Sequence, residues 1–369
     1  MQFYGKGHAV VKTKIKRILI TVLTVILLCI IGFAVYFFAS YYRVEDMLPL
    51  DAEGSAQRTE FPVGTEQKAV TFNIGFGAYE PDFDFFMDGG HESWAFSEER
   101  LQKNLSAITD FLREQDADIL LLQEVDENGT RSYHVNERTL IGNAMDGYST
   151  VWAQNWDVPF LPYPLYQPHG SNTSGILTFS RTGITSSVRR SLPVEDSLMR
   201  LVDLDRCYSV SRIPTENGHE LVLYNLHLSA YTSDGTIAVK QLEMILADMT
   251  HEYEQGNYVI AGGDFNKDLL GDSEKVFGFS GNNSTWAQPF PMEMLDGMPL
   301  HLCAPYDAEA PVPSCRNADS PYHEGQYVLT IDGFLVSDNI DVSYCNVIDT
   351  GFIYSDHNPA ELYFVLLPD

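Results

Sequence analysis

Residues 18–42 contain no charged side chain and are almost entirely apolar. A run of this length suits one helix crossing the roughly 30 Å hydrocarbon layer of a bilayer. Four basic residues lie between positions 12 and 17, and the positively charged flank of a span usually stays in the cytoplasm. The sequence therefore predicts a cytoplasmic N-terminus over residues 1–17, a transmembrane anchor over 18–42 and an extracytoplasmic remainder.

A cleavable secretory signal is the alternative for this run. Such signals have an apolar region of about 7–15 residues that ends in a small-x-small cleavage site. Here the apolar region is longer and ends in FFASYY. These features favour an uncleaved anchor, and both alternatives place the remainder outside the cytoplasm.

The rest of the chain is strongly acidic. Residues 1–43 hold six of the 23 basic residues and none of the 51 acidic ones, so residues 44–369 carry a formal net charge of −34. A body of this charge repels polyanions. Tight, sequence-independent binding of nucleic acid is therefore disfavoured.

A polar segment follows the apolar run. Residues 43–67 contain Pro and Gly and no apolar period, and they are predicted to be a tether. The hydrophobic content of 44% is ordinary for a globular protein. One folded domain is expected over residues 68–369, and we expect it to be a monomer.

Two amphipathic helices are predicted in this domain, over residues 97–115 with Ser97 as N-cap and over residues 236–255. Strands outnumber helices, and several are continuous apolar runs that need cover on both faces. We therefore expect an α/β fold, a two-sheet β-sandwich flanked by helices in four layers (α/β/β/α). The predicted strands are 68–74, 117–125, 174–181, 207–214, 220–229, 257–265, 327–337, 340–348 and 359–367.

Polar side chains end most of the buried strands. Burying carboxylates, amides and imidazoles costs free energy unless they share partners or a cation. Their recurrence at strand ends predicts that they converge in one site. The residues concerned are Asn73, Gln123, Glu124, Asn225, His227, Asp264, Asn266, Asp332, Asp356 and His357.

The segments that carry these residues resemble one known family. In order they are VTFNIGF, LLLQEVD, SGILTFSR, LYNLHLSAY, VIAGGDFN, TIDGFLVS and YSDHNP. The order is similar to that of the endonuclease/exonuclease/phosphatase superfamily of metal-dependent phosphoesterases, which includes deoxyribonucleases, abasic-site endonucleases, neutral sphingomyelinases and inositol-phosphate 5-phosphatases. The resemblance covers about residues 68–367.

The resemblance implies a metal site. Glu124 corresponds to the principal Mg²⁺ ligand, Asn73 lies close to the metal and the scissile phosphate, and Asp356 is a further carboxylate of the metal site. Phosphodiesters are anionic, so attack by water needs a cation to offset charge, and a few oxygen ligands suit Mg²⁺ or Mn²⁺.

The resemblance also implies catalytic roles. Asp264 and Asn266 correspond to the pair that orients or deprotonates the attacking water and binds a phosphate oxygen. His357, held by Asp332, stabilises developing charge or transfers a proton. His227 corresponds to the second catalytic histidine.

We therefore expect a membrane-anchored, extracytoplasmic, Mg²⁺-dependent enzyme that hydrolyses a phosphodiester by in-line attack of water. A lipid headgroup, a nucleic acid and a small phosphate ester remain open as substrates. The alternative is a catalytically idle relative that binds a partner through the same scaffold, although every expected catalytic position is filled.

Some residues have two interpretations. Arg131 and Tyr133 either contact substrate or form surface interactions. The aromatic side chains of the next segment either line a pocket or approach lipid, or they pack under a long loop. The length of the segment favours the loop. These residues are Trp156, Phe160, Tyr163 and Tyr166. The thiols at positions 303 and 315 either form a disulfide or stay free and buried.

Overall fold

The computed structural model describes residues 4–196, 201, 203–230, 236–278 and 287–368. The chain divides into two units, Met1–Tyr42 and Arg43–Asp369. In the first unit, helix α1 (Tyr4–Ser40) contains residues 18–40 of the predicted apolar run, which the sequence extends to residue 42. The helix is long and apolar enough to span a membrane, and a signal sequence would have the same properties.

The second unit contains two seven-stranded mixed sheets. Sheet A has the order β1-β7-β8-β9-β10-β14-β11, and sheet B has the order β15-β16-β3-β4-β6-β5-β2. The strands of sheet A are β1 (Leu48–Leu50), β7 (Ser186–Ser191), β8 (Cys207–Pro214), β9 (Glu220–His227), β10 (Tyr258–Asp264), β14 (Asp332–Ser337) and β11 (Leu300–Cys303). Those of sheet B are β15 (Ile340–Val347), β16 (Ala360–Leu366), β3 (Glu66–Asn73), β4 (Ile119–Gly129), β6 (Gly170–Ser180), β5 (Ser149–Leu161) and β2 (Glu53–Gly54).

The helices of this unit are short apart from two. They are α2 (Glu98–Glu114), α3 (Glu137–Ala144), α4 (Thr236–Glu254) and α5 (Ser273–Val276), with 3-10 turns η1 (Gly75–Gly77) and η3 (Met292–Leu295). A two-stranded sheet joins β12 (Cys315–Arg316) to β13 (Val328–Leu329).

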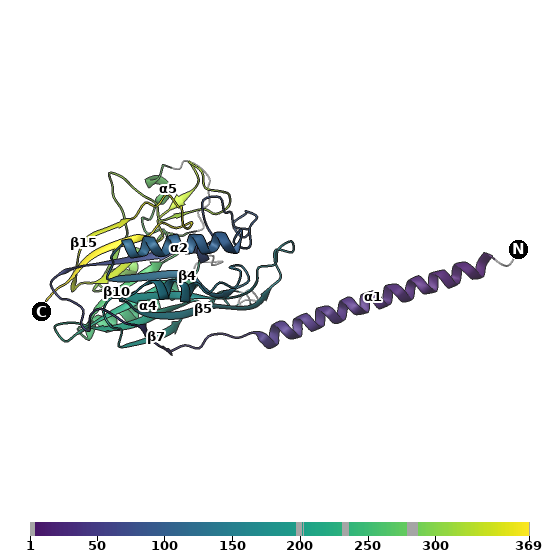
Figure 1. Ribbon diagram of the computed structural model, residues 1–369, viewed down its shortest axis with the longest axis horizontal. Coiled ribbons are helices and arrows are strands. Elements are labelled where there is room, and N and C mark those ends of the chain that lie inside the picture. Colours follow the sequence, from purple (N-terminus) through teal and green to yellow (C-terminus); the bar gives the residue numbers. More distant parts are fainter. Residues whose placement is uncertain (1–3, 197–200, 202, 231–235, 279–286, 369) are drawn as a thin grey trace. The chain divides into compact units, whose positions relative to one another are not determined.

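The four predicted layers are confirmed (Figure 1). The apolar face of α2, which includes Leu105 and Ile108, packs on the outer face of sheet B. The apolar face of α4, which includes Leu242 and Ile245, packs on the outer face of sheet A. A third core cluster fills the space between the two sheets.

Strand β4 is apolar at successive positions because both of its faces are buried. Leu120 and Leu122 join the core cluster under α2, whereas Ile119 and Leu121 join the cluster between the sheets. Side chains alternate between the two faces of a strand. A strand that is covered on both sides therefore needs apolar residues throughout, as the sequence predicted.

The prediction of a free tether over residues 43–67 is wrong for much of that segment. β1 pairs with β7, β2 pairs with β5, and Phe61 is completely buried between the sheets. Single apolar residues in a polar segment gave no period to detect. They fill positions at the sheet edges that the long strands leave open.

Two further expectations differ from the structure. The aromatic segment after Asn155 belongs to the hairpin of β5 and β6 and is not a long loop. The strand predicted over residues 327–337 is divided into β13 and β14, which belong to different sheets. The chain changes sheets at Thr330 and Ile331, both buried, which is why the apolar pattern continues through the break.

Candidate active site

Three predicted residues lie in one row across sheet A. β9 and β10 are parallel, and their register pairs His227 with Asp264. β14 runs antiparallel to β10 and pairs Asp332 with Asp264. Paired residues on neighbouring strands point to the same face. Nε2 of His227 accordingly lies 3.5 Å from Oδ2 of Asp264.

Asn73 ends β3 in sheet B and reaches this row. Its amide nitrogen donates to Oδ2 of Asp264 at 3.1 Å and to Oε1 of Glu124 at 3.3 Å. Glu124 lies where the pairing of β4 with β6 shifts register between Leu122 and Val125, and it adopts a φ of 55°. Bulges of this kind redirect a side chain. This one brings Glu124 to Asn73.

His357 reaches the row from the loop that precedes β16. Its Nδ1 donates to Oδ2 of Asp332 at 2.8 Å, and its Nε2 lies 3.9 Å from Oδ2 of Asp264. The hydroxyl of Ser314 donates to the same oxygen of Asp332 at 2.7 Å. Because Asp332 fixes the tautomer and the ring orientation, Nε2 of His357 faces the site.

The surroundings give these groups different protonation states. Burial and then the charge of Asp332 raise the pKa of Asp264 to about 7. Burial would lower the pKa of His357, but the charge and hydrogen bond of Asp332 raise it well above its ordinary value. Burial and then the charge of Arg206 hold the pKa of His227 well below its ordinary value. These shifts favour the protonated form of His357 and the neutral form of His227.

Glu124 and Asp356 bring two further carboxylates to the site. Burial raises the pKa of the Tyr79 hydroxyl, and the charges of both carboxylates raise it further. Burial and the charge of Glu124 raise the pKa of Asp356. The charges of Glu124 and Asp356 thus act on one hydroxyl, and that of Glu124 acts on Asp356, and a few oxygen donors suit a hard divalent cation. The donor set of Glu124 and Asp356 therefore fits Mg²⁺ or Mn²⁺.

The row itself offers a second group of donors. One ligand atom from each of Asp264, Asp332 and His357 lies within 4.8 Å of the others. Oδ1 of Asp332 is buried and has no hydrogen-bond partner among the residues that the structure describes. An unpaired buried carboxylate oxygen costs free energy. This group is therefore arranged to receive a further polar or cationic partner.

The side-chain amides of Asn73 and Asn266 both have hydrogen-bond partners within the protein. Oδ1 of Asn73 accepts the backbone N–H of Gly75, so Asn73 presents its nitrogen to the carboxylates and links them. The side-chain nitrogen of Asn266 donates to the carbonyl of Leu228, and the backbone N–H of Asn266 holds Oδ1 of Asp264 at 2.8 Å. Asn266 thus orients Asp264 through its backbone.

Arg131 is buried, so the expectation of a surface ion pair is wrong for this residue. Its Nε and Nη2 donate to both carboxylate oxygens of Asp126 at 3.0 and 2.8 Å. Its guanidinium carbon lies 3.9 Å from the ring centre of Phe76 and 4.8 Å from that of Trp156. Nη1 of Arg131 also lies 3.9 Å from Oε2 of Glu124. Arg131 therefore forms an ion pair with the carboxylate of Glu124.

Arg206, which directly precedes β8, was not among the predicted site residues. Its side chain is only 7% exposed, and its Nε and Nη1 have no hydrogen-bond partner within the described ranges. Its charge acts on His227. Buried guanidinium nitrogens that find no acceptor among the described residues are unfavourable, so Arg206 suits an anionic substrate. No motif around RCYS distinguishes it from a surface arginine.

The aromatic segment divides between two environments. Trp156 is buried against Arg131 and stacks near His169. Tyr163 and Tyr166 are 60% and 69% exposed at the tip of the β5–β6 hairpin. The thiols of Cys303 and Cys315 are both free, and Sγ of Cys315 lies 3.6 Å from Nε2 of His357.

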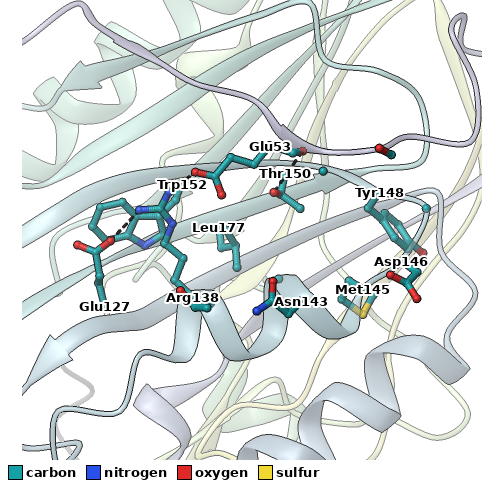
Figure 2. A pocket seen from close by; sticks show the side chains of 15 residues that line it. Glu53, Glu127, Arg138, Asn143, Met145, Asp146, Tyr148, Thr150, Trp152 and Leu177 are labelled. Carbon is teal, nitrogen blue, oxygen red and sulfur yellow. Dashed lines mark hydrogen bonds and ion pairs between the residues drawn. The ribbon is translucent and has the colours of Figure 1, made fainter.

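A cavity of about 580 Å³ lies elsewhere, between α3 and the edge formed by β2 and β5. Figure 2 shows Arg138 within it, held between Glu53 and Glu127, to which its guanidinium nitrogens donate at 2.7 Å each. None of the predicted site residues lines this cavity. The cavity is therefore separate from the candidate active site.

Comparisons with known proteins identify the family and the fold. A sequence model of the endonuclease/exonuclease/phosphatase family matches residues 70–357. A search of curated protein sequences gives no match. Among solved structures, a protein of this family from Beutenbergia cavernae is similar with a TM-score of 0.57 and 17% identity, over 82% of this chain and 72% of that one.

Two other similar structures have names that state an activity. A mannosyl-6-phosphatase of Bacteroides thetaiotaomicron matches with a TM-score of 0.52 and 16% identity, over 81% of this chain and 99% of that one. ANGEL2, described as a 2′,3′-cyclic phosphatase, matches with a TM-score of 0.52 and 16% identity, over 85% of this chain and 98% of that one. At these identities the similarities establish the fold.

Proposed function

Because this chain belongs to the endonuclease/exonuclease/phosphatase family, we propose that it is a membrane-anchored, divalent-metal-dependent enzyme that hydrolyses a phosphodiester. The observation that supports this most strongly is the row of His227, Asp264 and Asp332, with His357 hydrogen-bonded to Asp332. In this row the pKa of Asp264 is about 7, and the shifts of the two histidines favour a neutral His227 and a protonated His357.

Each residue of the row has a role in this proposal. Asp264, held by Asn73 and by the backbone of Asn266, accepts a proton from the attacking water. Protonated His357 donates from Nε2 to a phosphate oxygen or to the leaving group as negative charge develops. Neutral His227 adds a hydrogen bond beside Asp264.

Glu124 and Asp356 would hold the cation, which we propose to be Mg²⁺ or Mn²⁺. When bound, the cation offsets the charge of the phosphodiester and of its leaving oxygen. Arg131 holds the Glu124 carboxylate in place, and Arg206 supplies a further cationic group to the substrate. These groups provide the positive potential that an anionic substrate needs in a body with a net charge of −34.

An assay of the full-length chain with Mg²⁺ tests this proposal. We expect hydrolysis of bis-p-nitrophenyl phosphate, with a loss of roughly 100-fold or more in Asp264→Asn and His357→Ala. Equal rates in these variants and the wild type would reject the assignment. Complete inactivity on a broad phosphoester panel would favour a binding module, the second function that the sequence left open.

Parallel assays with phospholipid, plasmid DNA and small phosphate esters identify the substrate class. The net charge predicts poor activity on DNA, because binding through phosphates requires positive surface. Carbonate washing of membranes tests the anchor separately. Recovery of the full-length chain in the soluble fraction would contradict it.

A further inference from the structure

The tip of the β5–β6 hairpin exposes a group of apolar side chains, which we call the hairpin tip. It consists of Tyr163, Leu165 and Tyr166, which are 60%, 85% and 69% exposed, with Met87 of a neighbouring loop at 60%. The ring of Tyr163 packs on Phe86, and the hydroxyl of Tyr166 donates to the carbonyl of His91. The tip is thus fixed to the body while its apolar surface remains uncovered by the described residues.

The first residues of the body run beside the same hairpin. Glu53 and Gly54 pair antiparallel with Thr150 and Ser149 of β5, and β1, just before them, pairs with β7 of sheet A. Arg189 links the start of the body to β5, because it donates to the carbonyls of Val44 at 3.3 Å and Gln154 at 2.7 Å.

The first residues of the body are held beside Gln154 of β5. Nε of Arg43 pairs with Asp205 at 2.9 Å, and Nη1 of Arg189 donates to the carbonyl of Glu45 at 3.1 Å. Arg43 directly follows the apolar run in the sequence, so the folded body begins at the residue next to the predicted anchor. From Gln154, β5 continues for seven residues to Leu161 and then to the tip.

The catalytic strands end on the same side. β6 pairs antiparallel with both β4 and β5, so β4 and β5 run in the same direction. β3 is parallel to β4 and ends at Asn73. Gln154 and Val125 both pair with Gly175, so the first residues of the body lie level with the strand ends that carry Asn73 and Glu124, and the hairpin continues past them to its tip.

We propose that the hairpin tip docks into a zwitterionic phospholipid surface and directs the active site toward lipid headgroups. Tyrosines and a leucine at one tip suit the interface between headgroups and acyl chains. Asp84, Asp88 and Glu92 lie in the loop next to the tip, and the body is acidic throughout. These charges are repelled by anionic lipid, so the proposed partner is a neutral, zwitterionic bilayer such as phosphatidylcholine.

The docking proposal rests on the proposed anchor and names the substrate class of the proposed enzyme. Its test uses full-length protein in phosphatidylcholine nanodiscs with brominated acyl chains, which quench nearby tryptophan. The variant Leu165→Trp places a probe at the tip. The control Met292→Trp places one at another exposed apolar site, 52% exposed in η3, which leads to β11 at the sheet edge opposite β1.

We expect bromination to reduce the added emission of Leu165→Trp at least twofold and to leave that of Met292→Trp unchanged. Equal emission of the Leu165→Trp probe in brominated and ordinary discs would overturn the proposal. If the chain fails to co-elute with the discs, the anchor is contradicted, and the same measurement with added vesicles still decides whether the tip docks.

A second measurement separates docking from catalysis. The double variant Leu165→Asp and Tyr166→Asp should lower hydrolysis of vesicle phosphatidylcholine at least tenfold and change the rate on bis-p-nitrophenyl phosphate less than twofold. An unchanged rate on vesicles would contradict the docking. If the wild type hydrolyses neither vesicle phosphatidylcholine nor bis-p-nitrophenyl phosphate, the proposed enzyme is rejected, and the quenching result still decides the docking.

Discussion

The side-chain amide of Asn73 donates a 3.1 Å hydrogen bond to Oδ2 of Asp264, and the two residues belong to different sheets. They are 191 positions apart in the sequence. The site is therefore assembled where the ends of β3 and β10 meet. Its geometry depends on the packing of the sandwich as a whole.

Replacing Asn73 with alanine should lower kcat at least tenfold. The hydrogen bond from Asn73 lowers the pKa of Asp264, so its loss raises that pKa further and reduces the fraction of ionised base at neutral pH. Steady-state kinetics on bis-p-nitrophenyl phosphate measure the effect. Asn143→Ala, at an exposed position of α3, is the control and should keep wild-type kinetics. Wild-type kcat in Asn73→Ala would exclude this role.

The pH profile of kcat/KM should be bell-shaped. Asp264 must lose its proton to act as base, so activity rises as pH passes its pKa of about 7. His357 must keep its proton, and Asp332 raises its pKa, so activity falls only at higher pH. Bound cations lower both pKa values, so profiles are compared at one fixed Mg²⁺ concentration.

The variant Asp332→Asn tests the descending limb of that profile. Removing the carboxylate lowers the pKa of His357, so the limb should move to lower pH. Asp338→Asn is a matched control, because Asp338 pairs with His301 at 2.7 Å on the surface and should leave the profile unchanged. A descending limb at the wild-type position in Asp332→Asn would refute the assignment of His357.

Arg131→Met should destabilise the protein by about 3–5 kcal/mol, because it leaves the buried carboxylate of Asp126 without its partner. It should also reduce activity, since Glu124 loses the support of the guanidinium. Chemical denaturation measures the free energy of unfolding. The exposed Arg113, paired with Asp110 at 3.7 Å, gives the control Arg113→Met, expected within about 0.5 kcal/mol of wild type. Equal losses in both variants would contradict the buried role of Arg131.

The sequence predicted the layers of the fold and the convergence of the site for a physical reason. Strands covered on both faces must be apolar throughout, and polar residues such as Asn73 and Asp264 can interrupt them only where they find partners. The register that pairs His227 with Asp264 and Asp332 is not visible in the sequence. It follows from the order of strands in sheet A, which long-range packing determines.

Other features lacked a local signal. Arg131 and Arg206 are buried arginines, and the sequence around a buried arginine does not differ from that around an exposed one. Strand β5 was not predicted, and from Asn155 onward its prolines and aromatic residues resemble a loop, although the hairpin with β6 accommodates them. Edge strand β1 has only three residues, so it shows no period.

The polar residues at the strand ends are proposed to form one metal-dependent hydrolytic site. The most direct test strips the full-length chain with EDTA and follows the hydrolysis of bis-p-nitrophenyl phosphate as Mg²⁺ is returned. The predicted result is no activity without the cation, saturable recovery with it, and a requirement for at least tenfold more Mg²⁺ in Glu124→Gln. Equal rates in EDTA and in Mg²⁺, or wild-type recovery by Glu124→Gln, would contradict the account.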